Sequence, residues 1–132
     1  MSSHSKYKEF IFNEKIDKDS LSALYEDDYA YIEEIFSITL TQLHPDIARL
    51  PVAFKANDLS ELKKQVHKIK PSFGFVGMDA TQALCRAFED KCALASNTLS
   101  LSGEFEMLLR DVTEAAMIIE DELKKLKEHN KS

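Results

Sequence analysis

Glycine and proline are scarce in this chain, with three of each among 132 residues. An all-β sandwich or barrel needs many turn residues, so this scarcity favours long helices. No apolar run approaches the roughly 20 residues that a membrane span requires, and the polar opening Met-Ser-Ser-His-Ser-Lys does not have the form of a secretory signal. We therefore expect a cytoplasmic protein that does not bind membranes.

Basic residues are also few: the chain has 17 lysines and arginines and 23 acidic residues, so its net charge is −6. Nucleic acids and anionic membranes attract proteins with a net basic face, so we expect neither as the main partner. The length suits one domain, which at 44% hydrophobic and 30% charged residues has the composition of an ordinary globular protein. Such a domain needs no disulfide or metal ion to fold.

The two cysteines, Cys85 and Cys92, are seven residues apart. On a helix this spacing separates them by about 10 Å, beyond the ~7 Å between Cα atoms that a disulfide allows. The spacing is not typical of a zinc site either, so we expect half-buried, reduced thiols and no bound metal. A helical metal-binding protein remains an alternative, with the ligands His44, His67, Cys85 and Cys92.

Helical periodicity begins early in the chain. Residues 1–15 are expected to form an N-terminal tail, whose apolar cluster at 10–12 either docks on the domain or forms a short extended segment. Residues 16–128 are expected to form the domain, beginning with a short helix near 17–25. A longer helix starts near Asp28 and continues to Phe54 along one apolar stripe. Pro45 and Pro51 interrupt that stripe and predict a kink or break near His44.

Three further helices follow. Asp58 with Glu61 forms a capping-box pattern at the start of the first, and Gly77 is placed to end it. Asp79 with Gln82 repeats the pattern for the second. After a polar loop at 96–102, Ser102 is the expected N-cap of the third. The buried faces are expected to include Leu62, Val66, Ile69 and Phe73, then Leu84, Phe88 and Ala95, then Phe105, Val112, Ala116, Ile119 and Leu123.

Short connections imply antiparallel neighbours, so the sequence predicts an all-α fold. We expect an antiparallel up-down four-helix bundle with a short extra N-terminal helix. Four amphipathic helices in one chain can bury one another's apolar faces, so a monomer is expected.

The segment from Lys63 to Gly77 has the composition of a reactive site. At 100° per residue, His67 points about 125° away from the centre of its helix's apolar stripe and therefore into solvent. Lys63 lies one turn before it, Lys70 one turn after it and Gly74 two turns after it. The window 55–70 contains five lysines, including Lys64, against two acidic residues, so its net charge is +3 in a protein of −6.

A neutral imidazole beside ammonium groups suits phosphoryl chemistry. The imidazole is a nucleophile near neutral pH, and phosphoryl transfer requires chiefly positioning and positive charge near the non-bridging oxygens. The missing side chain at Gly74 would leave room for a partner to approach. Periodicity alone leaves a second interpretation open, since a histidine among lysines is also ordinary on a solvated helix face.

The run His67-Lys68-Ile69-Lys70-Pro71-Ser72-Phe73-Gly74-Phe75-Val76-Gly77 resembles the signature of histidine-containing phosphotransfer (HPt) domains. In that family lysine follows the phosphorylated histidine at +3, then small residues, then glycine at +10; these positions are Lys70, Ser72 with Gly74, and Gly77. The resemblance extends from about residue 16 to residue 126 and includes the expected order of helices.

The resemblance implies a phosphorelay protein without kinase activity of its own. His67 would accept the phosphoryl group, Lys70 would hold its oxygens, and Lys63 or Lys64 would assist. The partners would be a response-regulator receiver domain, a hybrid histidine kinase, or both. Mg²⁺ would belong to the receiver, so no cofactor is assigned to this chain. Apolar residues flanking the histidine helix, drawn partly from the first long helix, would form the docking surface.

Pro71 departs from the family pattern, which favours glycine at +4. Proline removes the helical partner of the His67 carbonyl and biases Lys70 away from helical dihedrals. The sequence thus predicts a kink where Lys70 must approach the phosphoryl group. This departure keeps open the alternative of a non-catalytic (pseudo-HPt) helical bundle that binds a receiver without accepting phosphate.

Overall fold

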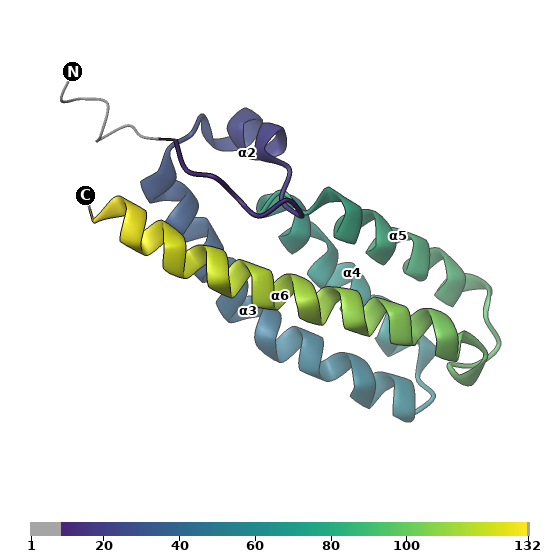
Figure 1. The fold of residues 1–132 in the computed structure, drawn as a ribbon. Helices are drawn as coiled ribbons and strands as arrows, with labels where there is room; N and C mark the ends of the chain where they lie inside the picture. Colours follow the sequence, from purple (N-terminus) through teal and green to yellow (C-terminus); the bar gives the residue numbers. More distant parts are fainter. Residues whose placement is uncertain (1–8, 132) are drawn as a thin grey trace, which may run out of the picture.

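The protein is an all-helical bundle in a computed structural model that describes residues 9–131. The elements are α2 (Lys18–Tyr25), α3 (Tyr29–Lys55), α4 (Leu59–Phe75), α5 (Asp79–Leu94), the 3₁₀ turn η1 (Leu99–Leu101) and α6 (Ser102–Asn130). These residues contain no strand. Helices α3 to α6 run up and down in alternation, and α2 lies beside the junction of α4 and α5 (Figure 1). The predicted four-helix bundle with a short extra helix is confirmed.

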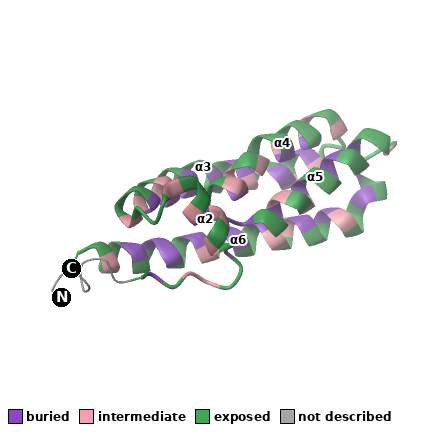
Figure 2. Ribbon diagram, turned by 90° about the horizontal axis from the view of Figure 1, so that it is seen from above, coloured by how far each residue is buried: buried purple, intermediate pink, exposed green. Residues whose placement is uncertain are grey.

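Each long helix has two main neighbours. Helix α3 packs against α4 and α6, and α5 packs closely against α4 and more loosely against α6. Buried positions recur along the inward side of every long helix (Figure 2). The fully buried core includes Ile32, Phe36, Leu43, Leu50, Leu62, Val66, Ile69, Phe73, Leu108, Val112, Ile119 and Leu126. The apolar stripes predicted for α3, α4 and α6 therefore face one common core.

Of the predicted kink or break near His44, the break is wrong, because helix α3 continues unbroken through Pro45 and Pro51. A proline inside a helix costs about 3 kcal/mol relative to alanine. Full burial of one leucine contributes roughly 1.5–3 kcal/mol, and Leu43 and Leu50 on either side of Pro45 are both fully buried. Packing against α4 and α6 thus outweighs the backbone hydrogen bonds that the prolines remove.

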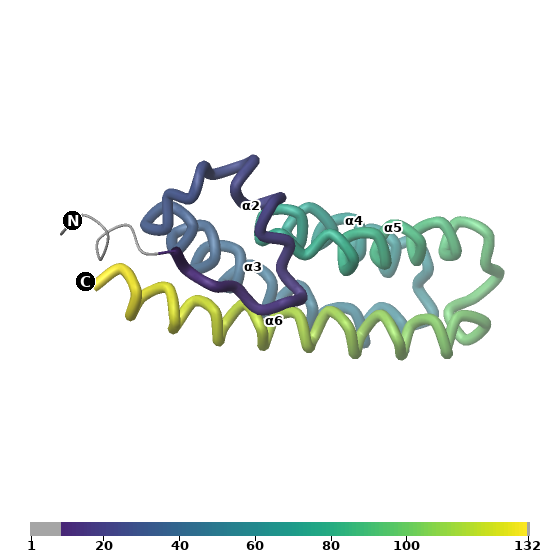
Figure 3. The backbone as a smooth tube through the Cα atoms, turned by 45° about the horizontal axis from the view of Figure 1, so that its top comes forward, coloured from purple at the N-terminus to yellow at the C-terminus, as the bar shows by residue number. Residues whose placement is uncertain are grey.

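The N-terminal segment docks on the bundle. It runs along α6 before it turns into α2 (Figure 3). Phe10 is buried and Phe12 half-buried, while Ile11 between them is 83% exposed. The backbone N–H of Asn13 donates to Oε1 of Glu122, a fully buried side chain of α6, at 2.8 Å. Of the expected tail, residues 9–15 are therefore packed in place, and residues 1–8 lie outside the described part.

Two of the predicted helix boundaries are confirmed by their hydrogen bonds. Oδ1 of Asp58 accepts from the Glu61 N–H at 3.0 Å and caps α4. At the other end Gly77 adopts φ +73°, and the Met78 N–H donates to the Phe73 carbonyl at 2.7 Å. This pattern is a Schellman motif, which requires a left-handed residue where only glycine is unstrained.

The other two predicted caps are wrong by one residue. Met78 is the N-cap of α5, and the carboxylate of Asp79 instead accepts a hydrogen bond from the Ser20 hydroxyl at 2.6 Å, which ties α5 to α2. Ser102 lies inside α6 and its hydroxyl donates to the Leu99 carbonyl, because η1 leads directly into the helix. Within residues 9–131, no helix has both the length and the apolar character needed to cross a membrane.

Candidate functional site

His67 stands on the outer side of α4. Its side chain is 70% exposed, whereas Val66 and Ile69 beside it are fully buried against the core. These buried neighbours fix the rotation of α4 about its axis, so the imidazole faces solvent as the helical periodicity predicts.

Glu89 of α5 contacts the inner nitrogen of that ring. Its Oε2 lies 3.1 Å from Nδ1 of His67. Because an ionised carboxylate can only accept hydrogen bonds, this contact places the imidazole proton on Nδ1. In the neutral ring Nε2 then keeps its lone pair, which is the electron pair a nucleophile needs.

Lys70 lies one turn along α4 and completes the cluster. Its Nζ forms an ion pair with Oε1 of Glu89 at 2.8 Å and lies 3.5 Å from Nδ1 of His67. Helix α4 continues through Pro71, so the predicted kink does not turn this amine away. Pro71 is exposed, while Ile69 and Phe73 on either side of it are fully buried and keep the helix in place.

The charge of Glu89 is maintained by these two neighbours. Burial by itself would raise the pKa of this carboxyl, but hydrogen bonds and positive charge from Lys70 and His67 outweigh burial. The pKa of Glu89 is therefore lowered from its ordinary value of 4.5. At neutral pH the carboxylate is ionised, accepts a hydrogen bond from the ring and forms an ion pair with the amine.

Three of the other predicted site residues lie apart from the cluster. Lys63 and Lys64 are exposed, and among the described residues the polar contacts of His67 are those with Glu89 and Lys70. Ser72 is half-buried on the side of α4 that faces α3, where it lines a hollow with Lys68. The lysines add positive charge near His67 without touching it.

The space beside Gly74 is not open, contrary to the prediction. A Cβ placed there would lie 2.8 Å from Nε2 of Gln82, because the Gln82 side chain of α5 covers this position. Gly74 therefore serves the close packing of α5 on α4, and any room for a partner depends on movement of a flexible amide.

The cysteines are more deeply buried than expected. Cys85 has no exposed surface, Cys92 is 5% exposed, and both are free thiols. Burial raises the pKa of Cys85 to about 12 and that of Cys92 to about 11. No group of three histidine, cysteine or acidic side chains in the described part of the chain is placed to hold a metal ion, so the alternative metal site finds no support.

Glu89 is a residue of this cluster that the apolar pattern does not predict, because that pattern centres the buried face of α5 on Leu84. Leu84 is only half-buried, and the buried residues of α5 are Thr81, Cys85, Phe88, Glu89 and Cys92. The series Thr81, Cys85, Phe88 and Cys92 has the 4, 3, 4 spacing of a buried seam. Counting the cysteines as core residues reveals this seam and places Glu89 one turn after Cys85.

Comparison with known proteins agrees with the geometry. The family model for the Hpt domain matches residues 34–129, so the chain belongs to the Hpt domain family. It is a phosphotransfer module of the phosphorelay type. The fold is similar to the HPt domain of a sensor hybrid histidine kinase from Shewanella, with a TM-score of 0.73 and 19% sequence identity over 84% of this chain and 95% of that one. No curated protein matches the chain.

Proposed function

We propose that this chain is a cytoplasmic histidine phosphotransfer protein in which Nε2 of His67 carries the phosphoryl group. The contact between Nδ1 of His67 and Glu89 supports this role most directly, because it fixes the tautomer that leaves the outer nitrogen nucleophilic. The donor is the aspartyl phosphate of a receiver domain or the phosphohistidine of a kinase, and the acceptor is a further receiver aspartate.

The positions of three side chains support transfer from a receiver. The lone pair of Nε2 forms a bond to phosphorus while the bond between phosphorus and the aspartyl oxygen breaks, and the aspartate leaves as a carboxylate. Lys70 stabilises negative charge on the non-bridging oxygens. Glu89 stabilises the positive charge that spreads over the ring, because Nδ1 keeps its proton throughout. The chain performs no kinase reaction and needs no cofactor of its own, since Mg²⁺ belongs to the receiver.

An apolar surface near His67 supports docking of a receiver. Leu24 of α2, Ile38 of α3 and Phe75 of α4 are each more than half exposed, and Tyr31 is 47% exposed. The Tyr25 hydroxyl donates to the Phe75 carbonyl at 2.7 Å and so joins α2 to the end of α4. Phe75 lies two turns beyond His67, so a partner over the histidine reaches this surface.

The alternative, a non-catalytic module that binds a receiver without accepting phosphate, requires a site that cannot hold the phosphoryl group. A Lys70 side chain turned away from His67 would support it. Its Nζ instead lies 3.5 Å from the ring, held by Glu89. The geometry therefore favours transfer.

The proposal is tested by incubating the protein with phosphorylated receiver domains from a panel, with Mg²⁺. We expect an acid-labile, alkali-stable label on the wild type and none on His67→Gln, whose melting temperature should be unchanged because the side chain is exposed. His44→Gln, also exposed on α3, is the matched control and should label normally. Labelling of His67→Gln at the wild-type level would refute the assignment.

A further inference from the structure

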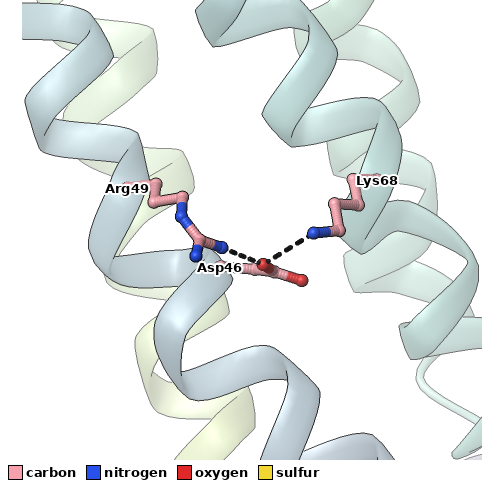
Figure 4. A network of polar contacts seen from close by, with 3 residues as sticks. All are labelled: Asp46, Arg49 and Lys68. Carbon is pink, nitrogen blue, oxygen red and sulfur yellow. Dashed lines mark hydrogen bonds and ion pairs between the residues drawn. The ribbon is translucent and has the colours of Figure 1, made fainter.

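Asp46 is a buried carboxylate that binds two cations from different helices. It lies in the middle of α3 with its side chain 9% exposed. One oxygen, Oδ1, accepts from Nη1 of Arg49 at 2.6 Å and from Nζ of Lys68 of α4 at 3.2 Å. Figure 4 shows Arg49 from the same helix and Lys68 from the neighbouring helix both directed at this oxygen.

The three charges leave one positive charge in excess, and within residues 9–131 most N–H donors of the two cations make no hydrogen bond. Lysine has three N–H donors and arginine five, and each makes one contact to Asp46. The Arg49 and Lys68 side chains are 54% and 59% exposed. Ion pairs to such exposed side chains add about 0–1 kcal/mol of stability, and burying a carboxylate between helices carries a desolvation cost. Folding stability alone does not explain this arrangement.

The cluster lies beside His67 but on the opposite side of the exposed ridge of α4. His67 and Lys68 are consecutive and diverge by about 100°, so His67 contacts Glu89 of α5 while Lys68 contacts Asp46 of α3. The cations line an open hollow, together with Gln42, Pro45 and Ser72. A partner that covers the α4 ridge to reach His67 also covers this hollow.

We infer that this hollow binds an acidic side chain of the docking receiver domain, and that Asp46 positions Lys68 and Arg49 to receive it. The inference rests on the proposed function and extends it by naming the chemistry of the contact. Asp46 draws two flexible cations toward the hollow before the partner arrives, which lowers the conformational entropy lost on binding. Their remaining N–H groups then donate to the incoming carboxylate.

A variant without the charge of Asp46 distinguishes two roles for this residue: positioning of Lys68 and Arg49, or no role beyond the attraction of these cations for an acidic partner. Asp46→Asn keeps the shape of the side chain but removes its negative charge, which raises the net charge of the cluster by one. If Lys68 and Arg49 acted through charge alone, an acidic partner would bind this variant more tightly. If Asp46 positions them, the variant binds more weakly, by about threefold.

The experiment measures the affinity of each receiver domain in the panel by calorimetry, with unphosphorylated partners. We expect Lys68→Gln and Arg49→Gln to weaken binding by about fivefold to tenfold. The matched control, Lys124→Gln, removes the same charge from an exposed position on α6, which packs against α3 and α5 and not closely against α4, and should change affinity by less than about twofold. Lys68→Glu should be rescued by reversing one acidic residue of the receiver to lysine.

The outcomes separate this inference from the proposed function. Receivers that bind in a Lys68-dependent way without phosphoryl transfer would support the hollow and refute the transfer role. Normal phosphoryl transfer with unchanged affinity in Lys68→Gln and Arg49→Gln would overturn the inference about the hollow and leave the proposed function standing. Tighter binding of a receiver by Asp46→Asn would do the same. Inorganic phosphate that protects Lys68 from acetylation at millimolar concentration would show a small-anion site instead. A panel in which no receiver binds would overturn both.

Discussion

Nδ1 of His67 on α4 lies 3.1 Å from Oε2 of Glu89 on α5. The other carboxylate oxygen of Glu89 pairs with Lys70 at 2.8 Å, so one side chain fixes both the ring and the amine. Phe88, which precedes Glu89, is buried in the core and holds this part of α5 in place. The arrangement of this ring and this amine thus depends on the packing of α5 against α4 and not on α4 alone.

The first prediction concerns the role of Glu89 in transfer. Glu89→Gln retains an oxygen that accepts from Nδ1 but loses the ion pair with Lys70, and Glu89→Ala loses both. We expect the transfer rate to fall by about threefold to tenfold for the glutamine variant and about a hundredfold for the alanine variant. The rate is measured as loss of label from a phosphorylated receiver. Asp90→Asn, an exposed neighbour, is the control, and wild-type rates in Glu89→Ala would contradict a positioning role.

The second prediction follows from the lowered pKa of Glu89. Its folded-state pKa lies below the ordinary 4.5, so at mildly acidic pH the unfolded chain binds more protons than the folded one. The stabilising contribution is therefore complete above pH 4.5 and is lost as the pH falls through the folded-state value. The difference in unfolding free energy between wild type and Glu89→Gln should be largest near neutral pH and should shrink in acid. Urea titrations across that range measure it, and a difference that grows in acid would contradict the assignment.

The apolar pattern predicted most of the fold. Ile32, Phe36 and Leu43 recur at helical spacing, and the structure buries all three completely. Periodicity succeeds here because the burial of aliphatic and aromatic side chains dominates the free energy of folding. The same dominance explains the wrong expectation at Pro45, where a local preference for a break is weaker than the packing of the flanking leucines.

The site could be predicted only in part. The exposure of His67 and the proximity of Lys70 follow from spacing within one helix, which a sequence contains directly. Glu89 and Asp46 could not be assigned this way, because burying a carboxylate requires partners that offset its desolvation, and each of these two has a partner on another helix. Those partners, Lys70 and Lys68, belong to α4, so the pairing depends on which helices become neighbours.

The third prediction concerns Pro71. Because this residue is exposed, Pro71→Ala opens no cavity, and it restores the N–H that the His67 carbonyl lacks. The helix should gain about 3 kcal/mol from the better helix former and lose about 1 kcal/mol through the more flexible unfolded chain. We expect a higher urea midpoint with an unchanged slope. Pro45→Ala, also exposed inside a helix, is the parallel variant, and a lower midpoint for both would contradict this account.

The fourth prediction concerns the thiols. Cys85 and Cys92 are buried, and their pKa values are raised to about 12 and about 11. Since the thiolate is the reactive form, both should resist alkylation by iodoacetamide at neutral pH while the protein is folded. Mass spectrometry should find two added groups after denaturation in urea and none before it. Rapid alkylation of the native protein would show that α5 opens readily.

The last prediction compares two glycines. At Gly77 a Cβ would lie 3.0 Å from the Asp17 carbonyl oxygen and 3.0 Å from Cγ of Leu21, in a backbone conformation with φ +73°. Gly77→Ala therefore combines left-handed strain with a clash against backbone and core, and should cost at least about 2 kcal/mol of stability.

At Gly74 the new methyl group would meet only the flexible end of Gln82, at 2.8 Å. Gly74→Ala also gains about 0.5–1 kcal/mol of helix propensity, so it should stay within about 1 kcal/mol of the wild type. Urea unfolding of both variants measures the two effects, and Gln82→Ala in the Gly74→Ala background should remove any remaining cost. A larger loss at Gly74 than at Gly77 would mean that the amide of Gln82 is rigidly held, and that α4 and α5 meet more tightly at this position than their side chains indicate.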